Sequence, residues 1–286
     1  MKVLVTGVSG QLGFDVMREL LARGIEAKGA SRSDFSLTDF AAMRRFVEVH
    51  RPTAIIHCAA YTAVDKAEDE PELCREVNAA ATGELARLAK EVGAKFLYIS
   101  TDYVFPGTGE DFYEPEDEKA PCNVYGESKL LGEEAAREAL EELFIVRISW
   151  VFGENGKNFV KTMLSLAERG IAPSVVADQT GRLTFASDLA AGIIHLISSG
   201  ADYGTYNLSG DGPILSWADI AKRVYERAGH SPDEVTPVTT EEYYAGQEGI
   251  APRPLSSVLD LARIKATGFT PADSTERLEA YLQELL

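Results

Sequence analysis

Short apolar runs alternate with amphipathic stretches through the first half of the chain. This pattern predicts strands over 3–6, 27–30, 54–58, 95–100 and 144–148, and helices over 11–23, 40–49, 73–92 and 123–142. Strands that are apolar throughout are typical of a parallel sheet covered by helices on both faces. With right-handed crossovers, residues 1–150 are therefore predicted to form a doubly wound α/β fold, a parallel Rossmann sheet.

The strand–helix rhythm loosens after residue 150. Helical patterns over 158–169, 187–198, 216–228 and 274–286 are joined by short strand patterns over 174–176 and 205–208. We expect residues 151–286 to form a smaller α/β lobe that closes over the carboxyl edge of the sheet, with some crossing of the chain between the lobes. No run approaches the roughly 20 apolar residues of a membrane span, so no membrane partner is expected.

The formal net charge of the 286 residues is -17. A nucleic-acid-binding protein needs a basic face, so we expect no nucleic-acid partner, whereas a few local cations can still bind an anionic small molecule. The three cysteines, Cys58, Cys74 and Cys122, are scattered and predict free thiols in a reducing cytoplasm. Neither they nor the histidines have metal-ligand spacing, and we predict no metal site.

A glycine-rich segment joins the first strand to the first helix. Gly7, Gly10 and Gly13 have the spacing G-x-x-G-x-x-G. Glycines permit a tight turn and the close approach of backbone to a pyrophosphate, whose charge lies at a helix N-terminus. The segment predicts a dinucleotide site, and an ordinary glycine turn is the alternative.

The end of the second strand bears on the choice of cofactor. An arginine at this point binds a 2′-phosphate, whereas an acid binds the ribose hydroxyls. Arg32 comes first, between Ser31 and Ser33, and this order favours NADPH. Asp34 lies near the acid position and leaves NADH open, and the alternative for both residues is a solvated loop.

Tyr125 and Lys129 lie four residues apart in a predicted helix and therefore share one face. An ammonium group lowers the pKa of a neighbouring phenol from its usual value of about 10. A phenol tuned in this way can donate the proton that reduction of a carbonyl requires. An exposed helix pair is the alternative interpretation.

Polar and aromatic residues follow two other predicted strands. Thr101 lies in a Ser-Thr-Asp-Tyr segment after the fourth strand, where its hydroxyl can bond a substrate carbonyl, or where the segment simply forms a turn. Trp150 follows the fifth strand. It can either cover a sugar ring or pack between the lobes.

Longer motifs extend over nearly the whole chain. They span 6–13, 57–68, 98–107, 123–129, 147–153, 158–163 and 253–260. In these motifs the chain resembles the extended short-chain dehydrogenase/reductases, and within them the dTDP-4-dehydrorhamnose reductase family. The resemblance implies an oxidoreductase that reduces the C4 keto group of dTDP-4-dehydro-L-rhamnose with NADPH to give dTDP-L-rhamnose, a precursor of cell-wall polysaccharide.

The same resemblance implies roles for individual residues. Thr101 takes the catalytic Ser/Thr position, Tyr125 is the proton donor, and Lys129 tunes the tyrosine and binds the nicotinamide ribose. The implied cofactor-binding residues also include Gly7, Ser9, Gly10, Gln11, Leu12, Gly13, Arg32, Ala59, Ala60, Tyr61, Asn78 and Ser100. The implied substrate-binding residues are Thr101, Asp102, Tyr103, Trp150, Asn158 and Arg253.

The chain departs from the family pattern at two positions. The family often has a proline after an Asp-Gln-x-Gly unit, where this chain has Arg182. The family pattern Leu-Asp-Ile-Thr after the second strand reads Phe-Ser-Leu-Thr over 35–38, which removes a carboxylate on the adenine side. Some relatives dimerise through bound Mg²⁺, for which we can place no site, and we expect a monomer or a homodimer.

Two other classes of function stay open. One is a different nucleotide-sugar 4-ketoreductase or epimerase on the same scaffold, and an epimerase would retain NAD through purification. The other is a non-catalytic regulatory subunit, such as the regulatory protein of methionine adenosyltransferase that shares this fold. The intact set of Thr101, Tyr125 and Lys129 disfavours the regulatory subunit.

Overall fold

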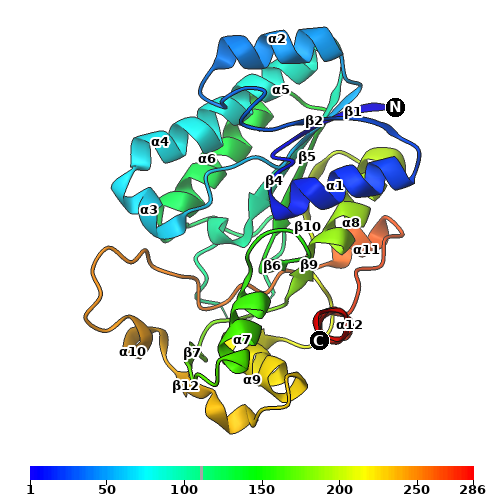
Figure 1. Ribbon diagram of the computed structural model, residues 1–286. Helices are drawn as coiled ribbons and strands as arrows, with labels where there is room; N and C mark the ends of the chain where they lie inside the picture. Colours follow the sequence, from blue (N-terminus) through cyan, green and yellow to red (C-terminus); the bar gives the residue numbers. More distant parts are fainter. Residues whose placement is uncertain (110–111) are drawn as a thin grey trace.

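A six-stranded parallel sheet forms the centre of the computed structural model, which describes residues 1–109 and 112–286 (Figure 1). The strand order is β10-β5-β4-β3-β1-β2. The strands are β1 (Lys2–Thr6), β2 (Glu26–Ala30), β3 (Ala54–His57), β4 (Lys95–Thr101), β5 (Leu143–Ile148) and β10 (Gly204–Asn207). The order reverses between β1 and β3, so the predicted doubly wound parallel sheet is confirmed.

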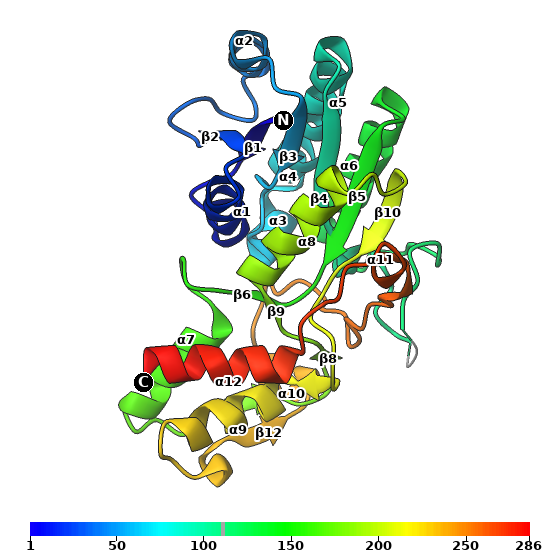
Figure 2. The same ribbon diagram turned by 90° about the vertical axis from the view of Figure 1, so that its right-hand side faces the viewer.

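Alternation of side chains along each strand gives the sheet two apolar faces. Val3 and Val5 of β1 pack with α1 (Gln11–Ala22) and α8 (Ala186–Ser198). Leu4 points to the other face, which is covered by α2 (Phe40–His50), α5 (Ala81–Val92) and α6 (Val124–Ala139). Figure 1 shows α1 and α8 on one side of the strands and α5 and α6 on the other, and Figure 2 looks onto the side of α1 and α8.

The helix expected over 73–92 is divided into three parts. A short helix, α4 (Pro71–Arg75), is followed by a π-helical turn over Glu76–Ala80 and then by α5, and a further short helix, α3 (Val64–Asp69), precedes them. In the π-helical turn, the carbonyl of Asn78 accepts hydrogen bonds from the Thr82 hydroxyl at 2.7 Å and the Tyr98 hydroxyl at 3.2 Å. Turns of this kind are frequent at functional sites.

Most of the chain after β5 forms a second apolar cluster, which includes Phe152, Val160 and Leu278. The elements of this part of the chain are β6 (Val151–Phe152), α7 (Phe159–Glu168), β7 (Ser174–Val176), β8 (Thr180–Gly181), β9 (Thr184–Phe185), β11 (Leu215–Ser216), α9 (Trp217–Arg227), β12 (Thr236–Val238), α10 (Thr240–Tyr244) and α12 (Ser274–Leu285).

Three elements of the second half belong to the sheet or pack on it, rather than joining this cluster. The strand pattern near 205–208 becomes β10, which pairs in parallel with β5. Apolar residues of α8, such as Leu189 and Ile193, pack on the same face as α1. The short helix α11 (Ala262–Ala266) also places Ile264 in this core. The boundary at residue 150 stays a prediction, and the chain crosses between the two regions after it.

Three observations concern the described residues as a set. None of their helices has the length and apolarity needed to span a bilayer. They contain no group of three or more His, Cys, Asp or Glu side chains arranged to hold a metal ion. Cys58, Cys74 and Cys122 are free cysteines.

Candidate active site

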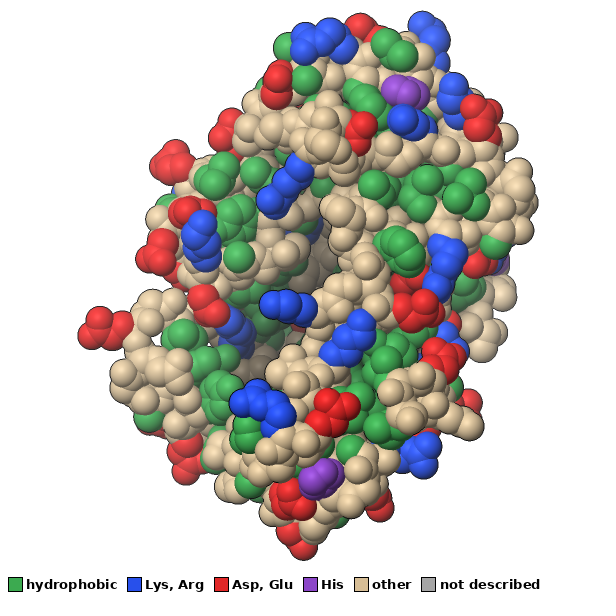
Figure 3. Space-filling model, in the orientation of Figure 1, with side chains coloured by type: hydrophobic (Ala, Val, Ile, Leu, Met, Phe, Trp, Pro, Cys, Tyr) green, Lys and Arg blue, Asp and Glu red, His purple; other side chains and the backbone are tan. Residues whose placement is uncertain are grey.

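The polar segments predicted from the sequence gather at the carboxyl edge of the sheet. β1, β3, β4 and β5 all end there because they are parallel. The molecular surface is hollowed in this region, and Lys and Arg side chains line the rim of the hollow (Figure 3). An anionic ligand would meet local positive charge there despite the acidic composition.

The glycine-rich segment between β1 and α1 is shaped for close approach. Gly7 has a φ of +72°, and a Cβ added to it would lie 2.7 Å from the backbone nitrogen of Ala59. A Cβ on Gly13 would collide with the carbonyl oxygen of Gly7. Gly10 is the N-cap of α1 and makes no side-chain cap hydrogen bond, so the first N–H groups of the helix are free of a cap. This cradle fits the pyrophosphate of a dinucleotide.

The residues beside the cradle take three different positions. Ser9 is exposed, and its carbonyl oxygen accepts a hydrogen bond from Asn155 Nδ2 at 3.3 Å. Gln11 is partly buried at the start of α1. Leu12 is buried in the core under the sheet. The structure thus brings Ser9 and Gln11 to the edge of the cradle. The Leu12 side chain packs in the core, so only its backbone in the first turn of α1 faces the cradle.

A chain of hydrogen bonds connects β1 to the segment after β3. The Thr6 hydroxyl accepts from the Ala59 N–H at 3.2 Å and lies 2.7 Å from His57 Nδ1. Burial, with a smaller effect of Lys129, lowers the pKa of His57 to about 3, so the imidazole is neutral. These contacts hold the backbone of Ala59 against Gly7.

Asn78 fixes the same segment from the other side. Its Oδ1 accepts from the Tyr61 N–H at 2.8 Å, and its Nδ2 donates to the Tyr61 carbonyl at 3.0 Å and to Ser128 Oγ at 2.9 Å. Asn78 therefore supports the wall formed by 59–61 from behind. Direct contact between Asn78 and a cofactor stays a prediction.

Arg32 lies just beyond β2 and is exposed. The neighbouring Asp34 is engaged within its own turn, because its carboxylate accepts from the backbone N–H and the hydroxyl of Ser31, each at 2.8 Å. These bonds lower the pKa of Asp34. With the acid occupied locally and the guanidinium exposed, the geometry favours recognition of a 2′-phosphate over a bare ribose.

Helix α6 carries the tyrosine and the lysine. Asn123 caps its start by accepting from the Gly126 N–H at 2.8 Å, which sets Tyr125 in the first turn. One turn later, buried Lys129 donates to the Ile99 carbonyl at 2.7 Å and lies 4.1 Å from the centre of the Tyr98 ring. The predicted pair therefore lies beside the end of β4.

Burial dominates the protonation of this pair. It lowers the pKa of Lys129 to about 7, and Glu133 opposes the change. It also raises the pKa of Tyr125 above its ordinary value, with partial opposition from a hydrogen bond of Thr101. The expectation that the pKa of Tyr125 is lowered is therefore wrong for this structure, since burial outweighs any help from Lys129. A phenol that keeps its proton at neutral pH is suited to donate it.

The segment after β4 brings three predicted residues together. Thr101 Oγ1 donates to Asp102 Oδ1 at 3.0 Å and accepts from the Tyr103 N–H at 3.3 Å. The Tyr103 ring meets the Tyr125 ring edge to face, with centroids 5.5 Å apart. Burial raises the pKa of Asp102 to about 6, and the neighbouring hydroxyl groups of Ser257 and Thr101 partly oppose this shift. The hydroxyl of Thr101, the carboxyl of Asp102 and the ring of Tyr103 thus lie on one short segment that contacts Tyr125.

Ser100 points away from this cluster. Its hydroxyl donates to Glu133 Oε1 at 2.6 Å, in a buried contact between β4 and α6. Contact between Ser100 and a cofactor stays a prediction, which in this geometry would involve its backbone.

Trp150 has both faces of its indole covered by protein. It has a φ of 49° and stacks on Trp217 with centroids 3.8 Å apart. A Cβ added to Gly181 would lie 2.8 Å from Cε2 and 3.0 Å from Cδ2 of Trp150, over the ring rather than at its edge. Because Trp217 occupies one face, Gly181 lies on the other. The structure favours packing between elements, and a substrate contact through the ring edge stays a prediction.

Asn158 caps helix α7. Its Oδ1 accepts from the Lys161 N–H at 3.0 Å, and its Nδ2 donates to the Gly153 carbonyl at 2.8 Å. Both the oxygen and the nitrogen of the side-chain amide are therefore already hydrogen-bonded within the protein. A role for Asn158 in substrate binding stays a prediction.

Arg253 lies on a segment that crosses the site. Its guanidinium donates to Asp65 Oδ1 at 2.7 Å, and the same oxygen accepts from the Ala251 N–H at 3.1 Å. The carbonyl of Pro252 accepts from Asn123 Nδ2 at 2.8 Å, at the start of α6. Arg253 also acts on the pKa of Tyr103, lowering it against the larger effect of burial. The structure therefore brings Arg253 to the Tyr103 side of the hollow.

Sequence reasoning missed several residues of this region. Ser257 acts on Asp102, Asp65 holds Arg253, Trp217 covers Trp150, and Glu133 binds Ser100. Only Glu133 had a readable signal, because it continues the four-residue spacing of Tyr125 and Lys129. Asp65 and Ser257 lie within the motifs over 57–68 and 253–260, but no local pattern connects them, or Trp217, to the residues that they contact.

Comparisons with known proteins agree over the full length. A family model described as the RmlD substrate binding domain matches residues 1–286. The spore coat polysaccharide biosynthesis protein SpsK of Bacillus subtilis is 38% identical over 283 residues, which cover 99% of this chain and 97% of that protein. The dTDP-4-dehydrorhamnose reductase of Mycolicibacterium smegmatis is 38% identical over 272 residues, 94% of this chain and 81% of the relative. A crystal structure of dTDP-4-dehydrorhamnose reductase from Bacillus anthracis in complex with NADP has a TM-score of 0.91 and 40% identity, and covers 99% of this chain and 100% of that chain.

Proposed function

The chain belongs to the RmlD substrate binding domain family, and from this premise we propose that it reduces the C4 keto group of dTDP-4-dehydro-L-rhamnose with NADPH. The product is dTDP-L-rhamnose. The observation that carries the proposal is the grouping of Thr101, Tyr125 and Lys129 beside the glycine cradle. Relatives at 38% and 40% identity that carry the reductase name support the same substrate.

The residues at the carboxyl edge of the sheet fit NADPH. The cradle of Gly7, Gly10 and Gly13 would hold the pyrophosphate at the start of α1, and exposed Arg32 would bind the 2′-phosphate. Ala59, Ala60 and Tyr61 would line the adjoining wall. When bound there, the cofactor supplies the hydride.

The chemistry left to the protein is orientation and proton transfer. Tyr125 keeps its proton in this buried setting and donates it to the C4 oxygen. Thr101 hydrogen-bonds the same oxygen and holds it in line with Tyr125. The Lys129 ammonium, which donates to the Ile99 carbonyl, stabilises the phenolate that results.

The remaining predicted residues surround the place where the sugar would bind. Asp102 and Tyr103 would contact its hydroxyls. A chain of net charge -17 needs a local cation for a dianionic diphosphate, and arginine offers it bidentate hydrogen bonds. Arg253 is the predicted residue for this role, with its present partner Asp65 displaced or shared.

Turnover assays test the proposal. Purified protein is mixed with dTDP-4-dehydro-L-rhamnose, and separately with other dTDP-4-keto sugars, using NADPH or NADH as the reductant. We expect one NADPH oxidised per dTDP-L-rhamnose formed, identified by NMR. Conversion without added reductant, together with tightly retained NAD, would identify an epimerase. Absence of turnover with every sugar would favour a regulatory subunit.

Two further features are part of the proposal. A cytoplasmic location agrees with the three free cysteines. The assembly is proposed to be a monomer or a homodimer. Sedimentation of the purified protein would distinguish the two.

A further inference from the structure

Glu133 extends the row of active-site residues along α6. Tyr125, Lys129 and Glu133 are spaced by four residues, so they lie one above another on the same face of the helix. The Glu133 side chain is completely buried, as is its partner Arg147 of β5. A fully buried ion pair therefore lies one helical turn from Lys129.

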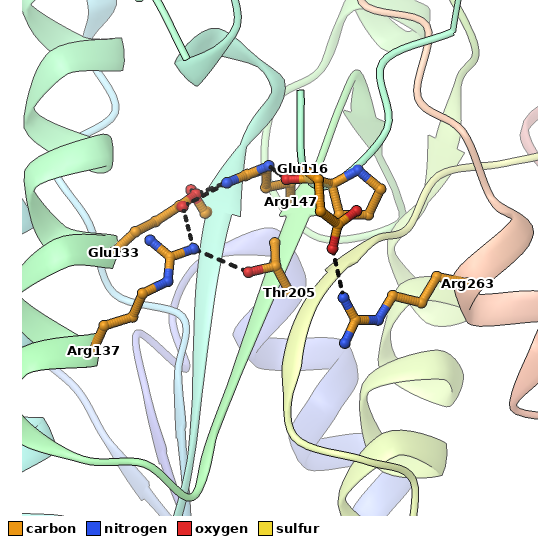
Figure 4. Close-up of polar contacts among 8 residues, drawn as sticks. Glu116, Glu133, Arg137, Arg147, Thr205 and Arg263 are labelled. Carbon is orange, nitrogen blue, oxygen red and sulfur yellow. Dashed lines mark hydrogen bonds and ion pairs between the residues drawn. The ribbon is translucent and has the colours of Figure 1, made fainter. Parts of the chain in front are cut away.

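Four donors surround the Glu133 carboxylate (Figure 4). Oε1 accepts from Ser100 Oγ at 2.6 Å and from Arg147 Nε at 2.8 Å. Oε2 accepts from Arg147 Nη2 at 2.7 Å and from Arg137 Nη2 at 3.1 Å. Arg137 also donates to Thr205 Oγ1 at 3.0 Å, on the edge strand β10. Glu133 therefore joins α6 to β4 and β5, and Arg137 of the same helix joins it to β10.

The opposite side of this ion pair is satisfied as well. Arg147 Nη1 donates to the Pro115 carbonyl at 2.7 Å, and the guanidinium lies 4.9 Å from the centre of the Phe105 ring. Arg147 and Ser100 are direct neighbours in the register of β5 and β4. The network thus reaches the residue that immediately precedes Thr101.

Stability alone is a weak reason for such a network. Removing two charges from water is expensive, and apolar residues of similar volume are often equally stabilising in place of a buried ion pair. The position of the network gives a better reason. Glu133 lies in α6 one turn after Lys129, and its partner Ser100 immediately precedes Thr101 in β4. Resting on the proposed function, we propose that Glu133 is a positioning residue. Its charge holds Lys129 as an ammonium, and its bond to Ser100 fixes the end of β4.

The other titratable groups that face Lys129 supply little negative charge at neutral pH. Burial raises the pKa of Cys58 to about 12 and also raises the pKa of Cys74. His57 is neutral, and burial raises the pKa of Tyr98 and Tyr125. Among the described residues that act on Lys129, Glu133 is the one that is ionised, because burial raises its pKa but Arg147 and Ser100 together outweigh burial and lower it.

The charges on Arg147 and Arg137 partly cancel that of Glu133. This arrangement gives the proposal two tests of opposite sign. Removing the carboxylate charge in Glu133→Gln weakens the hold on the ammonium of Lys129. Arg137→Gln removes a partly exposed cation, so the negative charge of Glu133 is less neutralised and stabilises the Lys129 ammonium more strongly.

The decisive experiment is the pH dependence of kcat/KM with NADPH and the dTDP-4-keto sugar. Activity of the wild type is expected to fall as pH rises through the pKa of Lys129. In Glu133→Gln this fall in kcat/KM moves to lower pH by about one unit. At pH values above the pKa of Lys129, the variant then has roughly a tenth of the wild-type kcat/KM. In Arg137→Gln the fall moves to higher pH by a smaller amount. Glu133→Asp, which keeps the charge, should restore most of the wild-type profile.

A second readout separates this proposal from the proposed function. The lysine Cε chemical shifts of ¹³C-labelled protein are titrated in the absence of substrate, with Lys129 assigned by Lys129→Met. The same opposite shifts should appear there even if the dTDP sugar proves to be the wrong substrate. Equal Lys129 titration in wild type, Glu133→Gln and Arg137→Gln would overturn the proposal. If Glu133→Gln does not fold, the alkaline shift of Arg137→Gln alone decides.

Discussion

Single residues of the site owe their protonation chiefly to burial. Lys129 loses most of its preference for the charged form, and Tyr125 becomes harder to ionise, although an amine and a phenol so close together would favour opposite charges in water. The free enzyme therefore holds a protonated phenol beside an ammonium that titrates near neutrality. Such a site is ready to give a proton and then to stabilise the phenolate.

Tyr125→Phe tests the proton donor. The phenyl ring keeps the contact with Tyr103 but removes the transferable proton. We expect NADPH affinity to be retained and turnover to fall by roughly 10²–10⁴, the usual effect of losing a positioned acid. Steady-state kinetics and NADPH titration measure the two quantities. Turnover within about threefold of wild type would be inconsistent with this role.

Lys129→Met tests the energetic consequence of burying a cation. The folded pKa of about 7 lies below the ordinary value of 10.5, so between these values the unfolded chain binds more protons than the folded protein. Wild-type stability contributed by this group therefore rises as pH increases from 7 to 10.5. We expect the inactive variant to be more stable than wild type at pH 7 by about 2–4 kcal/mol, since one pKa unit is worth about 1.36 kcal/mol.

Urea unfolding of Lys129→Met and wild type at pH 7 and near pH 10 checks the sign. The advantage of the variant should shrink as pH approaches 10.5, because less free energy is then needed to remove the proton that Lys129 carries in the unfolded chain. The lost hydrogen bond to Ile99 acts in the opposite direction at both values. A variant that is less stable at both pH values would mean that this bond outweighs the desolvation of the charge.

Arg32→Ala tests the choice between the two nicotinamide cofactors. A charge-assisted contact to the 2′-phosphate is worth roughly 1.5–3 kcal/mol, so NADPH affinity should fall by about 10- to 100-fold while NADH affinity changes little. Ser33→Ala is a matched control in the same turn, where Ser33 lies next to Ser31. Equal losses for NADPH and NADH would show that Arg32 does not recognise the phosphate.

The helices and strands agree with the sequence pattern where a run of apolar residues is enough to specify them. They differ from it where residues far away in the sequence form hydrogen bonds with them. The apolar runs of β1, β3, β4 and β5 could be identified because the sheet is covered on both faces. The break of the helix over 73–92 could not be identified, since the Asn78 carbonyl of the π-helical turn accepts a hydrogen bond from the Tyr98 hydroxyl of β4, a contact that no local pattern indicates. Likewise, nothing local indicates that Asn207 pairs with Arg147 across the sheet edge.

Helix α7 offers a test of a residue that has two interpretations. Asn158→Ala removes the cap of α7 and should destabilise the protein by about 1 kcal/mol, whereas Asn158→Asp keeps an acceptor for the Lys161 N–H and should recover most of it. Thermal unfolding compares the variants. If the amide also binds substrate, KM will rise in both variants. An unchanged KM in both would leave Asn158 as a helix cap alone.

The whole molecule brings its site together from regions that are far apart in sequence. The motifs predicted Thr101, Tyr125 and Lys129, which lie on adjacent elements, and they predicted Arg253 through the family resemblance. They assigned no role to Asp65, Ser257 or Trp217, because these contacts depend on how the segment over 250–258 lies against α3 and the end of β4, and on how α9 packs against Trp150. The residues of the local motifs could be predicted from the sequence, whereas the contacts between distant segments around the site required the tertiary structure.

Arg253 is where this closing segment meets the proposed substrate, and it can serve either as a ligand for the diphosphate or as a tie to α3. Arg253→Ala removes both roles, whereas Asp65→Asn weakens only the tie. If Arg253 binds phosphate, Arg253→Ala should raise KM for the dTDP sugar by roughly 10- to 100-fold and leave NADPH affinity unchanged. Asp65→Asn should then have little effect, or lower KM, because a competing carboxylate is lost. Equal rises of KM in both variants would instead show that Arg253 holds the segment in place and that the diphosphate is bound elsewhere.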